Sequence, residues 1–282
     1  NSLLEIFNDD NLKDLYTNVV HALVLILQNP KMHMLVYFDA FIERLLKVMK
    51  TANDSQMKDF LPQYSNLILN SAQNTAPFLK RSLDLIKERF SKELAPQFLD
   101  VICSFLIAIK DGFFEHASKT TCMLVSILDS AKTTSVPISC GVLKAFSLLG
   151  LIAHDLTYVI VSNICDVIQC DQTLYRVRLN ALQTLITLNR ELDLSSYFCS
   201  IIRSATHGIL YEDEKMRSTS LNLVITMLKV QGKKFLDDAQ CLIHLIKEKN
   251  LETQELAQVI SDVEQNDLIR DLEGLLIKKK QP

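Results

Sequence analysis

The sequence predicts an all-α protein, arranged as an α-solenoid of helix pairs with a period of about 40 residues. Turn-forming residues are scarce, since only six Gly and six Pro occur among 282 residues. This scarcity disfavours a β-sandwich, a barrel or a Gly-rich nucleotide-binding α/β fold. Apolar residues recur at helical spacing throughout the chain, and no stretch alternates with period two for long enough to predict a strand.

The apolar pattern divides the chain into helices that come in pairs. In one segment Val177, Ala181, Leu185 and Leu188 line a single helical face. A leading helix is expected at 12–28 and a trailing helix at 265–280. The first helices of the pairs are expected at 33–50, 76–91, 113–130, 155–169, 194–210 and 233–248. The second helices are expected at 54–73, 95–110, 137–153, 172–191, 213–231 and 252–263.

Aromatic residues near the starts of the first helices give the period. Successive members of this set lie 40, 80, 39 and 38 residues apart. A two-helix repeat of this length is typical of HEAT/armadillo-like solenoids, in which each pair buries its apolar face against the next. We therefore expect residues 1–282 to form one solenoid segment of about six helix pairs, cut from a longer chain. The set comprises Phe38, Phe78, Tyr158, Tyr197 and Phe235.

Polar residues and prolines at the expected turns support these boundaries. Asp54, Asp171 and Asp213 precede second helices, where a carboxylate can accept hydrogen bonds from the first N–H groups. Gly208 and Gly232 follow apolar runs and are interpreted as helix ends. Prolines lie near helix starts, where a missing N–H costs little, although the first of them would split or shift the 54–73 helix. They are Pro62, Pro77, Pro96 and Pro137.

Charge and cysteine usage narrow the class of function. The net charge of −3 gives no overall positive field for nucleic acid. The longest uncharged stretch, residues 60–79, contains two Pro and several amides, so no membrane span is expected. The seven Cys form no CxxC pair and are interpreted mostly as reduced core residues in a cytosolic or nuclear setting.

A repeated phrase in the second helices resembles the HEAT repeat. Residues 177–182 read V-R-x-x-A-L, and residues 216–221 repeat this phrase in weaker form, with Ser220 in place of Ala. In the HEAT family the Arg typically pairs with a loop Asp of a neighbouring unit. The resemblance therefore implies that Arg178 and Arg217 pair with Asp171 and Asp213.

Longer stretches resemble the late HEAT solenoid of target-of-rapamycin (TOR) kinases. The likeness rests on RVRLNALQTLITLNRELDLSSYFCSIIRSATHGI, KMRSTSLNLVITMLKVQGKKF and LIHLIKEKNL, with an upstream match in MKDFLPQYSNLILNSAQNTAPFLKRSLDLIKERF. It implies a scaffold segment before the FAT and kinase domains of a serine/threonine kinase. The resemblance also implies a Raptor-like adaptor as partner and a role in nutrient and growth signalling. The implied location is a cytoplasmic complex that binds peripherally to endomembranes.

Motif searches assign no catalytic, cofactor-binding or metal-binding residue, and no cofactor is expected. Kinase signatures and a phosphate loop are missing from the sequence. Two basic patches are interpreted as solvated faces, because acidic residues are interleaved with the first. The first comprises Lys80, Arg81, Lys87, Arg89 and Lys92, and the second comprises Lys278, Lys279 and Lys280.

Two other readings stay open from the sequence. One is a stand-alone HEAT adaptor, such as a transport receptor, a coat subunit or a phosphatase scaffold. The other is a helical enzyme, which is disfavoured because no catalytic motif is found in the sequence. An excised solenoid would also expose apolar surface at its first helix, so we expect self-association through Leu12, Leu15 and Val19.

Overall fold

A computed structural model of the chain describes residues 2–27 and 35–278. Within these ranges the regular structure is helical and no strand occurs, which confirms the predicted all-α class. Helices pack on their neighbours in chain order, the arrangement of an α-solenoid. Contacts divide the chain into two compact units. The first comprises Asn1–Asp129 and Pro137–Ala153, and the second comprises Ser130–Val136 and His154–Pro282.

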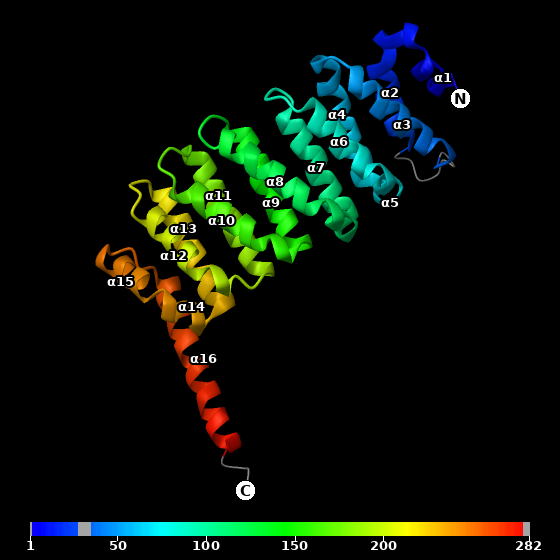
Figure 1. Cartoon of the computed structure of the whole chain (residues 1–282). Coiled ribbons are helices and arrows are strands. Elements are labelled where there is room, and N and C mark those ends of the chain that lie inside the picture. The colour runs from blue at the N-terminus through cyan, green and yellow to red at the C-terminus, as the bar shows by residue number, and fades with distance from the viewer. Residues whose placement is uncertain (1, 28–34, 279–282) are drawn as a thin grey trace. The chain divides into compact units, whose positions relative to one another are not determined.

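The first unit consists of consecutive helix pairs after two leading helices (Figure 1). Within it α4 packs on α2 and α7, α3 packs on α6, and Gly141 of α9 lies against Leu99 of α7. Its α-helices are α1 (Ser2–Asn8), α2 (Tyr16–Leu27), α3 (Leu35–Thr51), α4 (Asp54–Asn70), α5 (Ala72–Thr75), α6 (Leu79–Arg89), α7 (Ala95–Ile109), most of α8 (Phe114–Ala131) and α9 (Val136–Ile152). Short 3₁₀ turns are η1 (Asp10–Leu15), η2 (Ala76–Phe78) and η3 (Lys110–Phe113).

Polar contacts in this unit join each pair to the next. The buried hydroxyls of Ser65 in α4 and Ser104 in α7 lie 2.7 Å apart, at a sequence separation of 39. Arg81 of α6 donates to the Glu43 carboxylate of α3 at 2.8 Å, at a separation of 38. These separations agree with the predicted period of about 40 residues.

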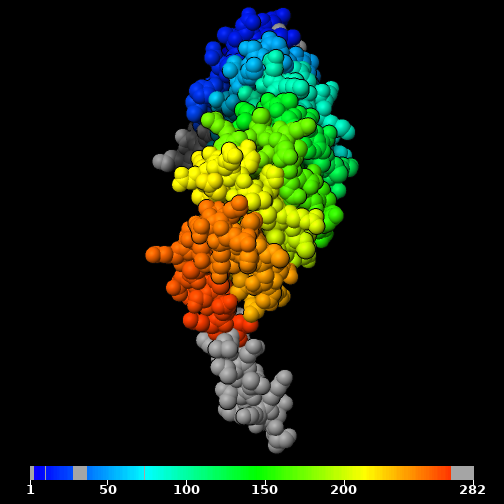
Figure 2. Space-filling model, turned by 90° about the vertical axis from the view of Figure 1, so that its left-hand side faces the viewer, coloured from blue at the N-terminus to red at the C-terminus, as the bar shows by residue number. Residues whose placement is uncertain are grey.

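The second unit continues the same scheme. In it α11 packs on α13 and α13 on α16, while α10 packs on α12 and α12 on α14 and α15. Figure 2 shows the surface of this unit formed by successive segments in chain order, from yellow to orange. Its helices are α10 (Thr157–Gln169), α11 (Tyr175–Glu191), α12 (Phe198–Ile209), α13 (Glu214–Gln231), α14 (Lys233–Asp238), α15 (Gln240–Glu248) and α16 (Gln254–Lys278), with turns η4 (His154–Leu156) and η5 (Ser195–Tyr197).

Aromatic rings in the second unit meet at intervals of one repeat. The rings of Tyr158 and Tyr197 lie 6.4 Å apart, and Phe198 meets Phe235 edge to face at 5.1 Å. Two of the aromatic residues that mark the period in the sequence, Tyr158 and Tyr197, are therefore in direct contact.

The helix boundaries agree with the sequence predictions within a few residues, with four exceptions. The helix predicted at 233–248 is divided at Ala239 into α14 and α15. The short helix α1 was not predicted. The helices predicted at 252–263 and 265–280 form one continuous helix, α16, as far as residue 278; residues 279 and 280 lie outside the described residues. Helix α4 also runs unbroken through Pro62, although the proline was expected to split or shift the helix.

The capping residues correct part of the turn analysis. The Asp213 carboxylate accepts a hydrogen bond from the Met216 N–H at 2.9 Å, which confirms its role as an N-cap. The cap of α4 is Asn53, one residue before the predicted Asp54, and it forms a reciprocal capping box with Gln56. Asp171 caps no helix, because α11 begins only at Tyr175.

The two glycines interpreted as helix ends differ in role. Gly232 follows α13 with a φ of 60°, a conformation that favours glycine at a helix end. Gly208 lies inside α12 instead. A Cβ atom there would come 2.0 Å from Ser220 Oγ of α13, so Gly208 permits the close approach of these two helices.

Cysteine burial also departs from expectation. Only Cys103 and Cys165 of the seven are buried, and burial raises the pKa of Cys103 to about 12 and that of Cys165 to about 11. Cys122, Cys199 and Cys241 are exposed instead. Each has one apolar neighbour in sequence but lies on an exposed part of its helix.

Candidate functional site

The described residues contain no group of three or more His, Cys, Asp or Glu that could hold a metal ion. None of the described helices is long and apolar enough to cross a membrane. Surfaces and grooves are therefore the features to consider, together with the contacts that fix the helices around them.

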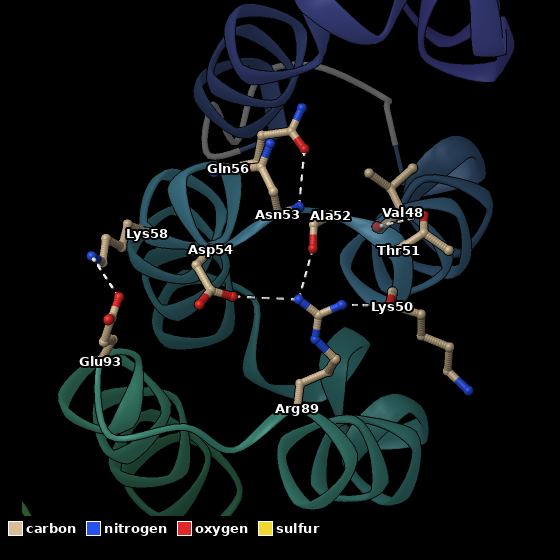
Figure 3. A network of polar contacts seen from close by, with 10 residues as sticks. All are labelled: Val48, Lys50, Thr51, Ala52, Asn53, Asp54, Gln56, Lys58, Arg89 and Glu93. Atoms are coloured by element: carbon tan, nitrogen blue, oxygen red, sulfur yellow. Dashed lines mark hydrogen bonds and ion pairs between the residues drawn. The ribbon is translucent and has the colours of Figure 1, made fainter.

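Arg89, at the end of α6, fixes the position of this helix against the preceding pair (Figure 3). Its guanidinium donates to the carbonyl oxygens of Lys50 and Ala52 at 2.7 Å each, and it lies 3.6 Å from the Asp54 carboxylate. Lys50 belongs to the last turn of α3, and Ala52 lies in the link between α3 and α4. Arg89 therefore contributes to structure and is not available to a partner.

Arg178 and Arg217 fix turns in the second unit in the same way. Arg178 is buried and donates to the Cys170 carbonyl at 2.8 Å, and its guanidinium covers the ring of Tyr211. Arg217 donates to the Glu212 carbonyl at 2.8 Å. The pairing of these arginines with Asp171 and Asp213, implied by the HEAT resemblance, is thus replaced by bonds to carbonyl oxygens.

The loop aspartates have other partners. The Tyr175 hydroxyl donates to Asp213 at 2.5 Å, and this bond together with the Met216 N–H lowers the pKa of Asp213. Asp171 lies 3.7 Å from the His207 ring instead. A phenol and an imidazole therefore occupy the positions at which guanidinium groups were expected.

A groove of about 800 Å³ lies between α6 and α8 in the first unit. Its apolar lining comes from both helices: Leu83 and Phe90 are half-buried on α6, or directly after it, and Met123 is half-buried on α8. Ile127 of α8 also lines the groove and is 8% exposed. The groove thus offers an accessible apolar floor between two helices.

Lysines line this groove from both walls. Lys80 and Lys87 project from α6 and Lys119 from α8, and all three are exposed. Asp84 is the one carboxylate among the lining residues. The groove is therefore positively charged within a chain whose net charge is −3.

Asp84 shares the groove with these lysines, but the next two acidic residues, Glu88 and Glu93, pair with lysines elsewhere. Glu88 lies 3.7 Å from Lys50, and Glu93, just after the helix, lies 3.7 Å from Lys58. The first pair joins α6 to α3, and the second joins the segment after α6 to α4. Within the described residues no ion pair involves Lys80, Lys87 or Lys119.

The predicted first basic patch is therefore divided. Lys80 and Lys87 line the groove, Arg81 pairs with Glu43, and Arg89 binds the carbonyls of a turn. Lys92 is exposed. In the second patch, the side chains of Lys278 to Lys280 lie outside the described residues.

A second groove, of about 990 Å³, lies between α13, α14 and α16. Its charges compensate one another: Lys233 lies 3.7 Å from Asp237 and 3.6 Å from Asp267. Its lining holds three lysines and three aspartates, so this groove lacks the excess positive charge of the α6–α8 groove.

Comparisons with known proteins identify relatives that match most of the chain. Residues 1–69 match the family described as the serine/threonine-protein kinase mTOR domain. The chain is 21% identical over 227 residues to the target of rapamycin homolog of Caenorhabditis elegans, covering 78% of this chain and 8% of that protein. It is 21% identical over 235 residues to the serine/threonine-protein kinase TOR2 of Saccharomyces cerevisiae, covering 83% of this chain and 9% of that protein.

The predicted resemblance to a TOR-type HEAT segment is confirmed. The TOR-like region extends over most of the chain, while the chain spans less than a tenth of the length of these relatives. The α6–α8 groove lies just after residues 1–69, which match the family description.

Proposed function

We propose that this TOR-like segment is a scaffold that docks a regulatory subunit of a serine/threonine kinase complex. The observation that carries the proposal is an open groove with unpaired lysines on a solenoid surface, in a chain similar to TOR kinases over most of its length. Stacked helix pairs present extended surfaces that suit protein binding. The phosphoryl transfer of the complex would belong to a kinase domain elsewhere in the polypeptide.

By the resemblance, the docked subunit is a Raptor-like adaptor, and the complex acts in nutrient-dependent control of growth. The cytoplasm, with peripheral attachment to endomembranes through the complex, is the proposed location. We further propose that residues 1–282 act as one solenoid segment within the longer protein.

Co-expression of this chain with the adaptor from the same source tests the proposal. Size-exclusion chromatography should show the two proteins eluting together at equal stoichiometry. The adaptor eluting alone at micromolar concentration of both proteins would contradict it. Retention of a vesicle-coat or transport cargo by the chain, with no adaptor binding, would favour the stand-alone HEAT adaptor instead.

A further inference from the structure

We propose that the α6–α8 groove binds an acidic amphipathic helix of a protein partner. This inference rests on the proposed scaffold function, and it adds the chemistry of the segment that docks. The argument uses the shape of the groove, its charge and the spacing of its lining residues.

The lining residues form two facing stripes. On α6 the positions Lys80, Asp84 and Lys87 follow one another at intervals of four and three, so they share one face of the helix. On α8 the positions Lys119, Met123 and Ile127 likewise share one face. From Lys80 to Lys87 the stripe extends about 10 Å, which is the length of two helical turns.

The order of polar and apolar groups across the groove defines the occupant. Leu83 and Met123 lie half-buried between the lysines. An amphipathic helix laid along the floor would bury apolar side chains at i, i+3, i+4 and i+7 against these residues. Carboxylates on both flanks of that helix would then face the lysines of α6 and α8, where opposite charge steers encounter and fixes the register.

Other polyanions fit the groove less well. A lipid surface would meet charges on a protruding face, whereas here the apolar groups lie at the bottom of a groove between two helices. Single-stranded nucleic acid is bound by basic grooves with accessible aromatic platforms. Phe90 is the only aromatic residue of the lining besides His116, and it is already stacked on Phe98 at 6.2 Å. A helical protein segment is therefore the favoured occupant.

Fluorescence anisotropy of a labelled synthetic peptide tests this inference on the full 282-residue chain. The probe has about 18 residues, with Leu along one helical face and Glu on both flanks. A second peptide has the same composition in scrambled order, and a third has Lys in place of every Glu. The designed peptide should bind at least about tenfold more tightly than either control, and more weakly as salt rises.

Two variants with the same change in net charge distinguish binding at the groove from non-specific electrostatic attraction to the chain. Replacement of Lys80, Lys87 and Lys119 by Glu should weaken binding at least about tenfold. The matched variant replaces Lys13, Lys215 and Lys249 by Glu; these lysines are exposed and lie outside the groove. It should change the affinity for the peptide less than about twofold. Circular dichroism of both variants checks that the helices are retained.

Cys122 provides an independent readout because it is exposed on the α8 wall of the groove. Saturating peptide should slow maleimide labelling of Cys122, while labelling of the exposed Cys199 and Cys241 stays unchanged. Equal effects of the two triple variants, equal binding of the scrambled peptide, or no protection of Cys122 would overturn the inference. Groove-dependent binding of phosphatidylserine vesicles or single-stranded RNA, in place of the peptide, would overturn it as well.

The peptide assay contains no adaptor, so its outcome is separable from that of the proposed function. Binding of the adaptor with no binding of the acidic peptide refutes the inference alone. Peptide binding at the groove with no adaptor complex refutes the proposed regulatory subunit and leaves the groove chemistry standing.

Discussion

At the scale of single residues, the close approach of α12 and α13 depends on Gly208. The Ser220 hydroxyl that faces it is buried and has no hydrogen-bond partner among the described residues. Replacing Gly208 by Ala should therefore destabilise the fold by about 1–3 kcal/mol through overpacking, although Ala is otherwise the better helix former. Urea denaturation measures this change.

A double-mutant cycle identifies the cause. Ser220→Ala removes the oxygen that a Cβ at Gly208 would meet at 2.0 Å and leaves the Ser220 Cβ at 3.2 Å. The Gly208→Ala/Ser220→Ala variant should recover at least about half of the lost stability. Additive effects of the two substitutions would show that the clash at Ser220 is not the source of the destabilisation.

His207 predicts a pH dependence of stability. Burial, and next the Arg178 guanidinium at 3.3 Å, lower the pKa of His207, and the Asp171 carboxylate opposes them. The folded state therefore binds the His207 proton less well than the unfolded state does. The stability that the neutral imidazole contributes to the fold is complete above the ordinary pKa of 6.5. It is lost as the pH falls below that value.

The unfolding free energy should therefore decrease between about pH 7 and pH 5, and His207→Gln should flatten part of this decrease. Urea unfolding at several pH values provides the measurement. The lowered pKa values of Asp193 and Asp213 act at more acidic pH, because both start from 3.8. If the His207→Gln variant lost stability with falling pH as steeply as the original chain, the role of His207 would be contradicted.

At the scale of helices, α4 contains a proline that its fold does not need. Pro62 is exposed in the middle of Asp54–Asn70, so it removes one backbone hydrogen bond and buries no side chain in return. Pro62→Ala should raise the unfolding free energy by about 1–3 kcal/mol. An unchanged or lower midpoint in urea would show that the proline ring makes a contact that offsets this cost.

Helix positions were predictable because their signals are local. The apolar stripe through Val177, Ala181 and Leu185 is fully buried in α11, and Asp213 caps α13 as its sequence position suggests. The division of α16 was wrong because a polar run looked like a break between two helices. The helix continues through residues 264–267, Glu-Gln-Asn-Asp, whose side chains are mostly exposed.

The candidate groove could not be predicted from sequence, because its charge depends on distant partners. On α6 alone, Glu88 and Glu93 look able to neutralise Lys87 and its neighbours. In the structure these glutamates pair with Lys50 and Lys58 of the preceding helix pair, at sequence separations of 38 and 35. Only the packing of α6 on α3 leaves the lysines facing α8 unpaired.

At the scale of the whole molecule, nearest-neighbour stacking explains why contacts recur at one repeat length. Asn189 of α11 donates to the Thr226 carbonyl of α13 at 3.1 Å, at a separation of 37 residues, close to the 39 between Ser65 and Ser104. A solenoid built in this way has no single central core, so its stability is a sum over adjacent pairs. Apolar groups that a neighbouring pair does not cover therefore face solvent.

The helices at the start of the chain present such groups. Leu15 is 44% exposed and Leu25 is 55% exposed, whereas Val19 is buried and Leu12 is half-buried. Of the residues expected to drive self-association, Leu15 is therefore the one available at the surface, and Val19 is not. Burial of exposed leucines between two copies would lower the free energy of association by roughly 25 cal/mol for each Å² of apolar surface.

Sedimentation velocity over a range of concentrations should accordingly show reversible self-association of this chain. Leu15→Glu together with Leu25→Glu should shift the equilibrium towards the monomer by at least about tenfold, since an unpaired carboxylate would enter the interface. The matched variant Leu210→Glu, at a residue that is also 55% exposed but lies in the second unit, should leave it unchanged. A monomer at all concentrations, or equal effects of both variants, would refute association through the first helices.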